Sequence, residues 1–277
     1  MKVLPFIKMH GLGNDYVFVD CFPPQTATQI AATDLCVLAQ RVSDRHCGIG
    51  SDGLVLILPD KETDARMRMF NADGTEAQMC GNAIRCVAKY LYESGICRRQ
   101  RMRIATLAGL RELELHVSEE TVRMVTVNMG RPVVKPDTLL LDGRELPFMN
   151  VNMGNPHAVF FCDELPSPEQ LATTGRQIGT HLHFTEGTNV EYARIRNDRE
   201  LELRVWERGT GETMACGTGA CATAVAAIRQ GLTQRELTVH LRGGDLGITW
   251  PADNEPVYMT GSATEVFRGE WKQNEQV

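Results

Sequence analysis

The sequence has no long apolar run, no basic stripe and no CxxC pair, and each absence removes a class of protein. No run approaches the roughly 20 apolar residues of a membrane helix, and the N-terminus lacks a cleavable signal pattern, so we expect no membrane partner. A net charge of −6 gives no reason to expect nucleic acid. Nine cysteines without a CxxC pair disfavour a disulfide framework and favour a reducing compartment, so we expect a cytoplasmic protein.

The overall amino-acid composition is that of a soluble globular protein. Hydrophobic residues make up 43% of the chain and charged residues 23%. A length of 277 residues is enough for two domains of ordinary size.

Two short cysteine motifs repeat at one spacing. Met79-Cys80-Gly81-Asn82 and Ala215-Cys216-Gly217-Thr218 lie 216 − 80 = 136 positions apart. Other matches recur in the same order: Phe70 with Trp206, Glu76 with Glu212, Gly95 with Gly231, Leu12-Gly13-Asn14 with Met153-Gly154-Asn155, and, at an offset of 137, Gly50-Ser51-Asp52 with Gly187-Thr188-Asn189. A repeat of only two copies predicts paired domains rather than a solenoid.

Local patterns predict one buried helix and paired strands in each half. Apolar residues at helical spacing follow Cys80, and Gly95 is a plausible stop; after Cys216 the run 220–228 is small or apolar almost all round and ends at Gly231. Alternating segments flank turn residues at 54–58 and 66–70, and again at 190–195 and 201–206. We therefore predict an α/β (α+β) fold of two pseudo-symmetric domains, each a mostly antiparallel sheet around a central helix. The predicted domains are 1–120, completed by 264–277, and 121–263.

A cysteine that opens a helix is a candidate thiolate, because free N–H groups and the helix dipole stabilise negative charge there. A paired thiol and thiolate suit removal of a proton from one face of a carbon and its return to the other, which is racemisation or epimerisation. Without a cofactor, the protein must stabilise a developing dianionic carboxylate. The amides of Gly81, Asn82, Gly217 and Thr218 are candidates for that task.

The other polar positions fit a small zwitterionic ligand. Glu207-Arg208, just before the second helix, could hold an ammonium and a carboxylate. His157 is the only histidine inside a repeated motif. Loop asparagines offer both a donor and an acceptor; they are Asn14, Asn71, Asn155 and Asn189.

Five ordered motifs make the chain resemble the diaminopimelate epimerase family over essentially its whole length. They are Lys8 to Asp15, Phe70-Asn71-Ala72-Asp73-Gly74 running into Cys80-Gly81-Asn82, Gly154-Asn155-Pro156-His157, Gly187-Thr188-Asn189-Val190-Glu191, and Glu207-Arg208-Gly209 running into Cys216-Gly217-Thr218-Gly219. The resemblance implies cofactor-independent interconversion of LL- and meso-diaminopimelate, on the bacterial route to lysine and peptidoglycan. It also implies two domains that close over substrate, and a homodimer.

By this resemblance, Cys80 is the proton donor and Cys216 the proton acceptor in the LL-to-meso direction. His157 and Glu207 tune the thiols. Substrate contacts fall to the four asparagines named above, Glu207 and Arg208. The chain departs from the family pattern at three places: Gly53 stands where some members carry a ligand-touching glutamine, Ala83 replaces a glycine, and Thr185 stands where proline is common.

Plainer interpretations apply to the other candidate residues. We expect six further cysteines to be buried and structural: Cys21, Cys36, Cys86, Cys97, Cys162 and Cys221. His181 and His183 lack a nearby third ligand, so we expect exposed strand histidines and no metal. Two rival functions stay open. One is a proline racemase-like enzyme, and the other is a non-catalytic binding or redox-sensing protein.

Overall fold

A computed structural model describes residues 2–273, and its contacts divide the chain into two compact units. Unit 1 comprises the chain up to Val127 and again from Ser262, and unit 2 comprises Asn128–Gly261. The predicted C-terminal segment 264–277 falls in unit 1 as far as residue 273; residues 274–277 lie outside the described part. The backbone therefore passes between the units twice.

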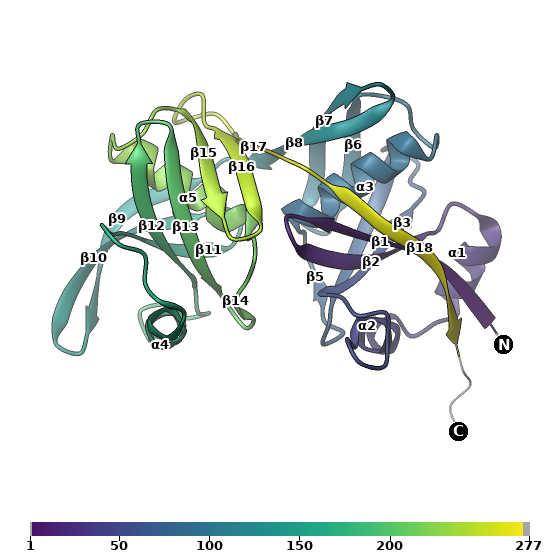
Figure 1. The fold of residues 1–277 in the computed structure, drawn as a ribbon, viewed down its shortest axis with the longest axis horizontal. Coiled ribbons are helices and arrows are strands. Elements are labelled where there is room, and N and C mark those ends of the chain that lie inside the picture. Colours follow the sequence, from purple (N-terminus) through teal and green to yellow (C-terminus); the bar gives the residue numbers. More distant parts are fainter. Residues whose placement is uncertain (1, 274–277) are drawn as a thin grey trace. The chain divides into compact units, whose positions relative to one another are not determined.

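Unit 1 is a mixed sheet with three helices (Figure 1). Its strands pair mostly antiparallel, with parallel pairs β2–β3 and β4–β6. Its elements are β1 (Lys2–Gly11), β2 (Asn14–Asp20), α1 (Pro24–Ala31), α2 (Leu35–Ser43), β3 (Gly53–Leu58), β4 (Ala65–Asn71), β5 (Glu76–Ala77), α3 (Gly81–Glu93), β6 (Arg101–Thr106), β7 (Gly109–Ser118), β8 (Thr121–Gly130) and β18 (Thr264–Gln273). Strand β8 continues across the boundary into unit 2.

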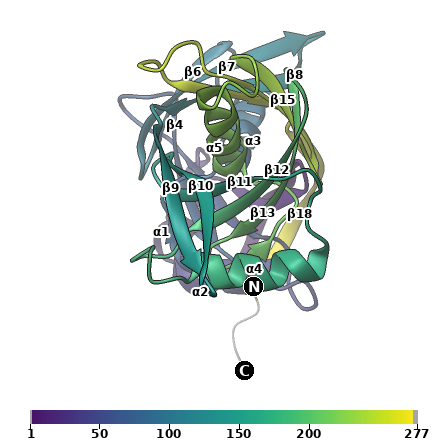
Figure 2. The ribbon, with the colours of Figure 1, turned by 90° about the vertical axis from the view of Figure 1, so that its left-hand side faces the viewer.

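Unit 2 repeats this plan, with parallel pairs β11–β12 and β13–β15 among antiparallel ones. Its elements are β9 (Val133–Leu141), β10 (Arg144–Asn152), β11 (Pro156–Phe161), α4 (Pro168–Gly179), β12 (Asn189–Asn197), β13 (Glu200–Glu207), β14 (Gly211–Glu212), α5 (Gly217–Arg229), β15 (Glu236–Leu241), β16 (Gly244–Thr249) and β17 (Val257–Gly261). Figure 2 looks along α5, with strands of the unit around it; the helix contacts β9 to β13 and β15 to β17.

The two central helices begin and end where the sequence predicts. Cys80 is the N-cap of α3 and Cys216 the N-cap of α5, each with extended backbone. Residues 81–91 of α3 are all buried, and α5 is buried from Gly217 to Ile228 except at Thr218. Each helix is followed by a glycine in the left-handed region, Gly95 at φ 81° and Gly231 at φ 72°, which a side chain would disfavour. The predicted fold class is confirmed.

Strand register shows how the halves correspond. Phe70 pairs with Leu54 and with Glu76 in unit 1, while Trp206 pairs with Val190 and with Glu212 in unit 2. The offset is 190 − 54 = 206 − 70 = 136, the same as between the two cysteines. Side chains one position away on these strands therefore also correspond.

One predicted match is out of register. The sequence aligns Asp52 with Asn189 at an offset of 137, whereas the strands align Gly53 with Asn189. The preceding loops do match, since Gly50 and Gly187 both have positive φ, 82° and 71°. The loop from Gly187 into β12 is one residue shorter than its counterpart in unit 1, and this shifts the alignment.

Candidate active site

In unit 1, the start of α3 brings Cys80 next to two predicted asparagines. The Cys80 Sγ donates to Asn14 Oδ1 at 3.4 Å, and Asn82 Nδ2 donates to the same oxygen at 3.2 Å. The hydroxyl of Tyr16 approaches Sγ at 3.9 Å. Burial raises the pKa of Tyr16 well above 10.0, so this hydroxyl keeps its proton. The Asn14 oxygen is thus a close acceptor for Cys80 Sγ, and the Tyr16 hydroxyl is a more distant donor.

In unit 2, the start of α5 surrounds Cys216 with donors. The N–H of Gly219 donates to Cys216 Sγ at 3.3 Å, and the Thr218 hydroxyl lies 3.6 Å from it. Asn155 Nδ2 donates to Thr218 Oγ1 at 3.3 Å, and Asn155 Oδ1 lies 3.1 Å from His157 Nε2. Four predicted site residues therefore form one connected cluster.

Burial nevertheless raises the pKa of Cys216 well above 9.0, and the carboxylates of Glu207 and Glu191 raise it further. The hydrogen bonds from Thr218 and the Gly219 N–H act in the opposite direction but do not offset burial. The helix terminus therefore does not by itself bring the pKa of Cys216 below its ordinary value. Loss of hydration and two nearby acids outweigh a helix dipole of roughly half a charge.

Glu191 is a site residue that the sequence analysis did not single out. Its Oε1 lies 2.6 Å from His157 Nδ1, and both side chains are fully buried. Within residues 2–273, Glu191 Oε2 has no hydrogen-bond partner. Burial raises the pKa of Glu191, and His157 opposes the shift. The signal available in the sequence was a glutamate between Val190 and Tyr192, inside the predicted strand 190–195.

The loop residues of unit 2 are tied together by Asn189. Its Nδ2 donates to the Pro156 carbonyl at 2.9 Å and its Oδ1 accepts from the Arg208 N–H at 2.9 Å. The Arg208 guanidinium is exposed and donates to the Glu186 carbonyl at 2.7 Å. Glu207 accepts from the Thr213 hydroxyl, and burial raises the pKa of its carboxyl.

Asn71 stands apart from the cluster around Cys80. It ends β4, is exposed, and its Nδ2 donates to Thr75 Oγ1 at 3.0 Å. It corresponds in register to Glu207, which is one position after Trp206 as Asn71 is one after Phe70.

Several plainer expectations can also be compared with the structure. All nine cysteines are free thiols, but Cys36 is exposed on α2 and Cys162 is half-buried, so the expected burial is wrong for both. His181 and His183 lie in a turn between α4 and β12 rather than in a strand, and His183 pairs with Asp137 at 3.2 Å. Within residues 2–273, no cluster of three metal-ligating side chains occurs, and no helix has the length and composition to cross a membrane.

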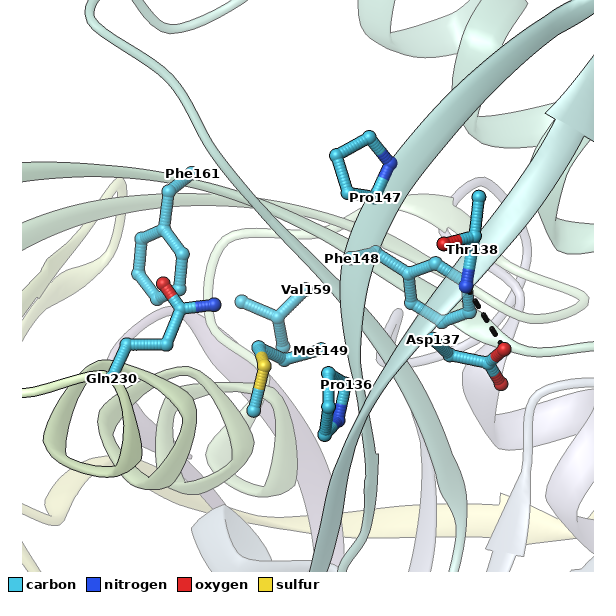
Figure 3. A pocket seen from close by; sticks show the side chains of 9 residues that line it. All are labelled: Pro136, Asp137, Thr138, Pro147, Phe148, Met149, Val159, Phe161 and Gln230. Atoms are coloured by element: carbon cyan, nitrogen blue, oxygen red, sulfur yellow. Dashed lines mark hydrogen bonds between the residues drawn. The ribbon is translucent and has the colours of Figure 1, made fainter.

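A cavity of about 440 Å³ in unit 2 contains none of these predicted site residues (Figure 3). Its lining comes largely from β9, β10 and β11: Pro136, Asp137, Thr138, Pro147, Phe148, Met149, Val159 and Phe161, with Gln230 from the end of α5.

The sequence matches the family model described as diaminopimelate epimerase over residues 6–135 and 149–266. Three similar proteins carry the name diaminopimelate epimerase. The one from Acetivibrio thermocellus is 46% identical over 98% of this chain and 99% of its own. The one from Pelotomaculum thermopropionicum is 48% identical over 96% and 98%. The one from Methanococcus maripaludis is 43% identical over 96% and 99%.

Solved structures share the fold at low identity. A phenazine biosynthesis protein from Bacillus anthracis superposes with a TM-score of 0.79 at 17% identity, over 99% of this chain and 100% of its own. A probable proline racemase from Agrobacterium radiobacter gives 0.72 at 13%, over 98% and 93%. These likenesses concern architecture, and the family match decides between the rival enzymes.

Proposed function

The chain belongs to the diaminopimelate epimerase family, and we propose that Cys80 and Cys216 perform the two proton transfers of that epimerisation. The enzyme is an isomerase that interconverts LL- and meso-diaminopimelate. The observation that carries the proposed roles is that each unit places one cysteine at the N-cap of its buried central helix, at matching positions of the two sheets.

In the LL-to-meso direction, the Cys216 thiolate takes the α-proton and the Cys80 thiol gives its proton to the opposite face. Cys216 ends as a thiol and Cys80 as a thiolate, so proton exchange with solvent resets the pair. The two units are taken as the counterparts of the two predicted epimerase domains, 1–120 with 264–277 and 121–263.

Cys216 must lose its proton before it can act as a base. We propose that the substrate ammonium supports this step, because a cation near Glu207 offsets the carboxylates that raise the pKa of Cys216. The surrounding donors, Gly219 N–H and Thr218, then stabilise the thiolate. The N–H groups at 81–82 and 217–218 stabilise the carboxylate as negative charge develops on it.

The polar loops bind the rest of the substrate. Asn14, Asn71, Asn155, Asn189, Glu207 and Arg208 are proposed contacts, with His157 and Glu207 tuning the sulfur of unit 2. Arg208 fits a carboxylate, since its guanidinium is exposed and can bind two oxygens at once. No cofactor is needed in this mechanism. A homodimer is carried over from the family resemblance, and nine free thiols support a cytoplasmic location.

The test is incubation of LL-diaminopimelate with the protein in deuterated water without added cofactor. We expect deuterium at one α-carbon together with formation of the meso isomer. Cys80→Ala and Cys216→Ala should each abolish turnover, whereas Cys36→Ala, at an exposed cysteine, should not. Full turnover by either of the first two variants would remove the proposed roles.

A further inference from the structure

A hydrogen-bonded chain in unit 1 runs past the sulfur of Cys80 between two charged side chains. Arg85, fully buried on α3, donates from Nη2 to Asn82 Oδ1 at 2.9 Å. Asn82 Nδ2 donates to Asn14 Oδ1 at 3.2 Å, and Asn14 Nδ2 donates to Asp52 Oδ2 at 2.8 Å. Each of the two amides therefore uses both of its ends inside the chain.

The ends of this chain fix its direction. A guanidinium can only donate hydrogen bonds and a carboxylate can only accept them. Rotating either amide by half a turn would therefore place donor against donor or acceptor against acceptor. Arg85 is itself held by the carbonyls of Gly81 at 3.2 Å and Ser262 at 3.1 Å. Asp52 is held by the Asp15 N–H at 2.9 Å and by Arg45 at 2.9 Å.

The fixed direction determines which end of the Asn14 amide lies against Cys80. The Asn14 oxygen, not its NH2 group, lies 3.4 Å from Sγ. A carbonyl oxygen accepts the S–H of a thiol but repels a thiolate. The Tyr16 hydroxyl is a more distant donor to Cys80 Sγ, at 3.9 Å, whereas Cys216 Sγ is approached by the Gly219 N–H at 3.3 Å and by the Thr218 hydroxyl at 3.6 Å.

We propose that Arg85 and Asp52 are positioning residues that hold the Asn14 oxygen against Cys80 and thereby keep Cys80 a thiol between turnovers. This inference rests on the proposed function in one respect only, namely that the Cys80 thiol is the proton donor. Its test needs no substrate. Loss of turnover and loss of the thiol preference are measured separately.

The test is a double-mutant cycle in the Cys216→Ala protein, read by the rate at which iodoacetamide alkylates Cys80 at one fixed pH. Asp52→Asn removes an anion and should speed alkylation, and Arg85→Met removes a cation and should slow it. Either charged end alone still fixes the orientation of both amides, so each single substitution should change the alkylation rate by less than about threefold. In the double variant the lost charges cancel and the Asn14 amide is free to donate to sulfur. We expect a rate about tenfold above the product of the single effects.

A control cycle uses Arg66 and Asp60, a surface ion pair of the same unit, and should be additive. Far-UV circular dichroism checks folding, and Arg85→Gln, which also removes the cation, replaces Arg85→Met if the latter unfolds. A second measurement needs neither variant. The infrared difference between Cys216→Ala and Cys80→Ala/Cys216→Ala proteins should contain the S–H band of Cys80. Additivity in the Asp52–Arg85 cycle, or absence of that band, overturns the proposal.

Discussion

Truncation of Glu191 should be among the most damaging single changes in unit 2. Its carboxylate and the imidazole of His157 are both fully buried and lie 2.6 Å apart. Glu191→Ala removes one member of this pair and leaves His157 Nδ1 without its partner. It also opens a cavity beside α5, since Glu191 Oε1 lies 2.9 Å from where a Cβ on Gly219 would be.

The magnitude follows from two overlapping costs. Removing one partner of a buried salt bridge destabilises a protein by about 3–5 kcal/mol, because the other charge is left uncompensated. Leaving a buried donor unsatisfied costs roughly 1–3 kcal/mol of that amount. We therefore expect Glu191→Ala to lower the free energy of unfolding by about 3–5 kcal/mol. Glu191→Gln keeps the volume and one hydrogen bond, so its cost should be about half as large.

Urea denaturation followed by circular dichroism measures this loss. Glu236→Ala, at an exposed glutamate that begins β15, is the matched control and should change stability by less than about 0.5 kcal/mol. A cost below about 1 kcal/mol for Glu191→Ala would refute the reasoning, because it would mean that His157 is satisfied without the carboxylate.

Two further predictions follow from the same structure. In a Cys80→Ala protein, alkylation of Cys216 should be slow at neutral pH, and its rate should still be rising above pH 9.0 because the pKa of Cys216 lies well above that value. Glu207→Gln should speed this alkylation at any fixed alkaline pH, because it removes one of the carboxylates that raise the pKa. An unchanged rate would contradict that contribution of Glu207. Gly175→Ala on α4 should lower the free energy of unfolding by about 1–3 kcal/mol, since the new Cβ would lie 2.6 Å from Trp206 Cγ, whereas Gln177→Ala on the exposed face of the same helix should be close to neutral in urea denaturation.

Local signals were enough to place the two central helices. Small residues after each cysteine, apolar residues at helical spacing and a terminal glycine are all encoded within about four turns of chain. The hairpins β3–β4 and β12–β13 were equally accessible, because alternation and a turn lie next to each other in the sequence. The parallel pairs β2–β3 and β11–β12 were not predicted, since they join segments separated by helices.

The site was harder to predict where burial decides the chemistry. The position of Cys216 at a helix start is visible in the sequence, but its complete loss of hydration and the closeness of Glu191 are consequences of packing. The pairing register of the strands was a second feature that could not be predicted from the sequence. One residue fewer between Gly187 and β12 moved the correspondence of Asn189 from Asp52 to Gly53, a shift that only paired strands reveal.

The duplicated backbone carries different side chains at the positions that matter for sulfur. Register and the loop motifs align Tyr16 with His157, Val55 with Glu191, Gly53 with Asn189, and Asn71 with Glu207. The proposed reaction requires one thiol and one thiolate at the same moment. Two identical halves would give both sulfurs the same proton affinity, and half of the singly protonated molecules would then be poised for the wrong direction. The surroundings of the two sulfurs are unlike and remove that symmetry: the Asn14 oxygen lies 3.4 Å and the Tyr16 hydroxyl 3.9 Å from Cys80 Sγ, whereas the Gly219 N–H and the Thr218 hydroxyl approach Cys216 Sγ.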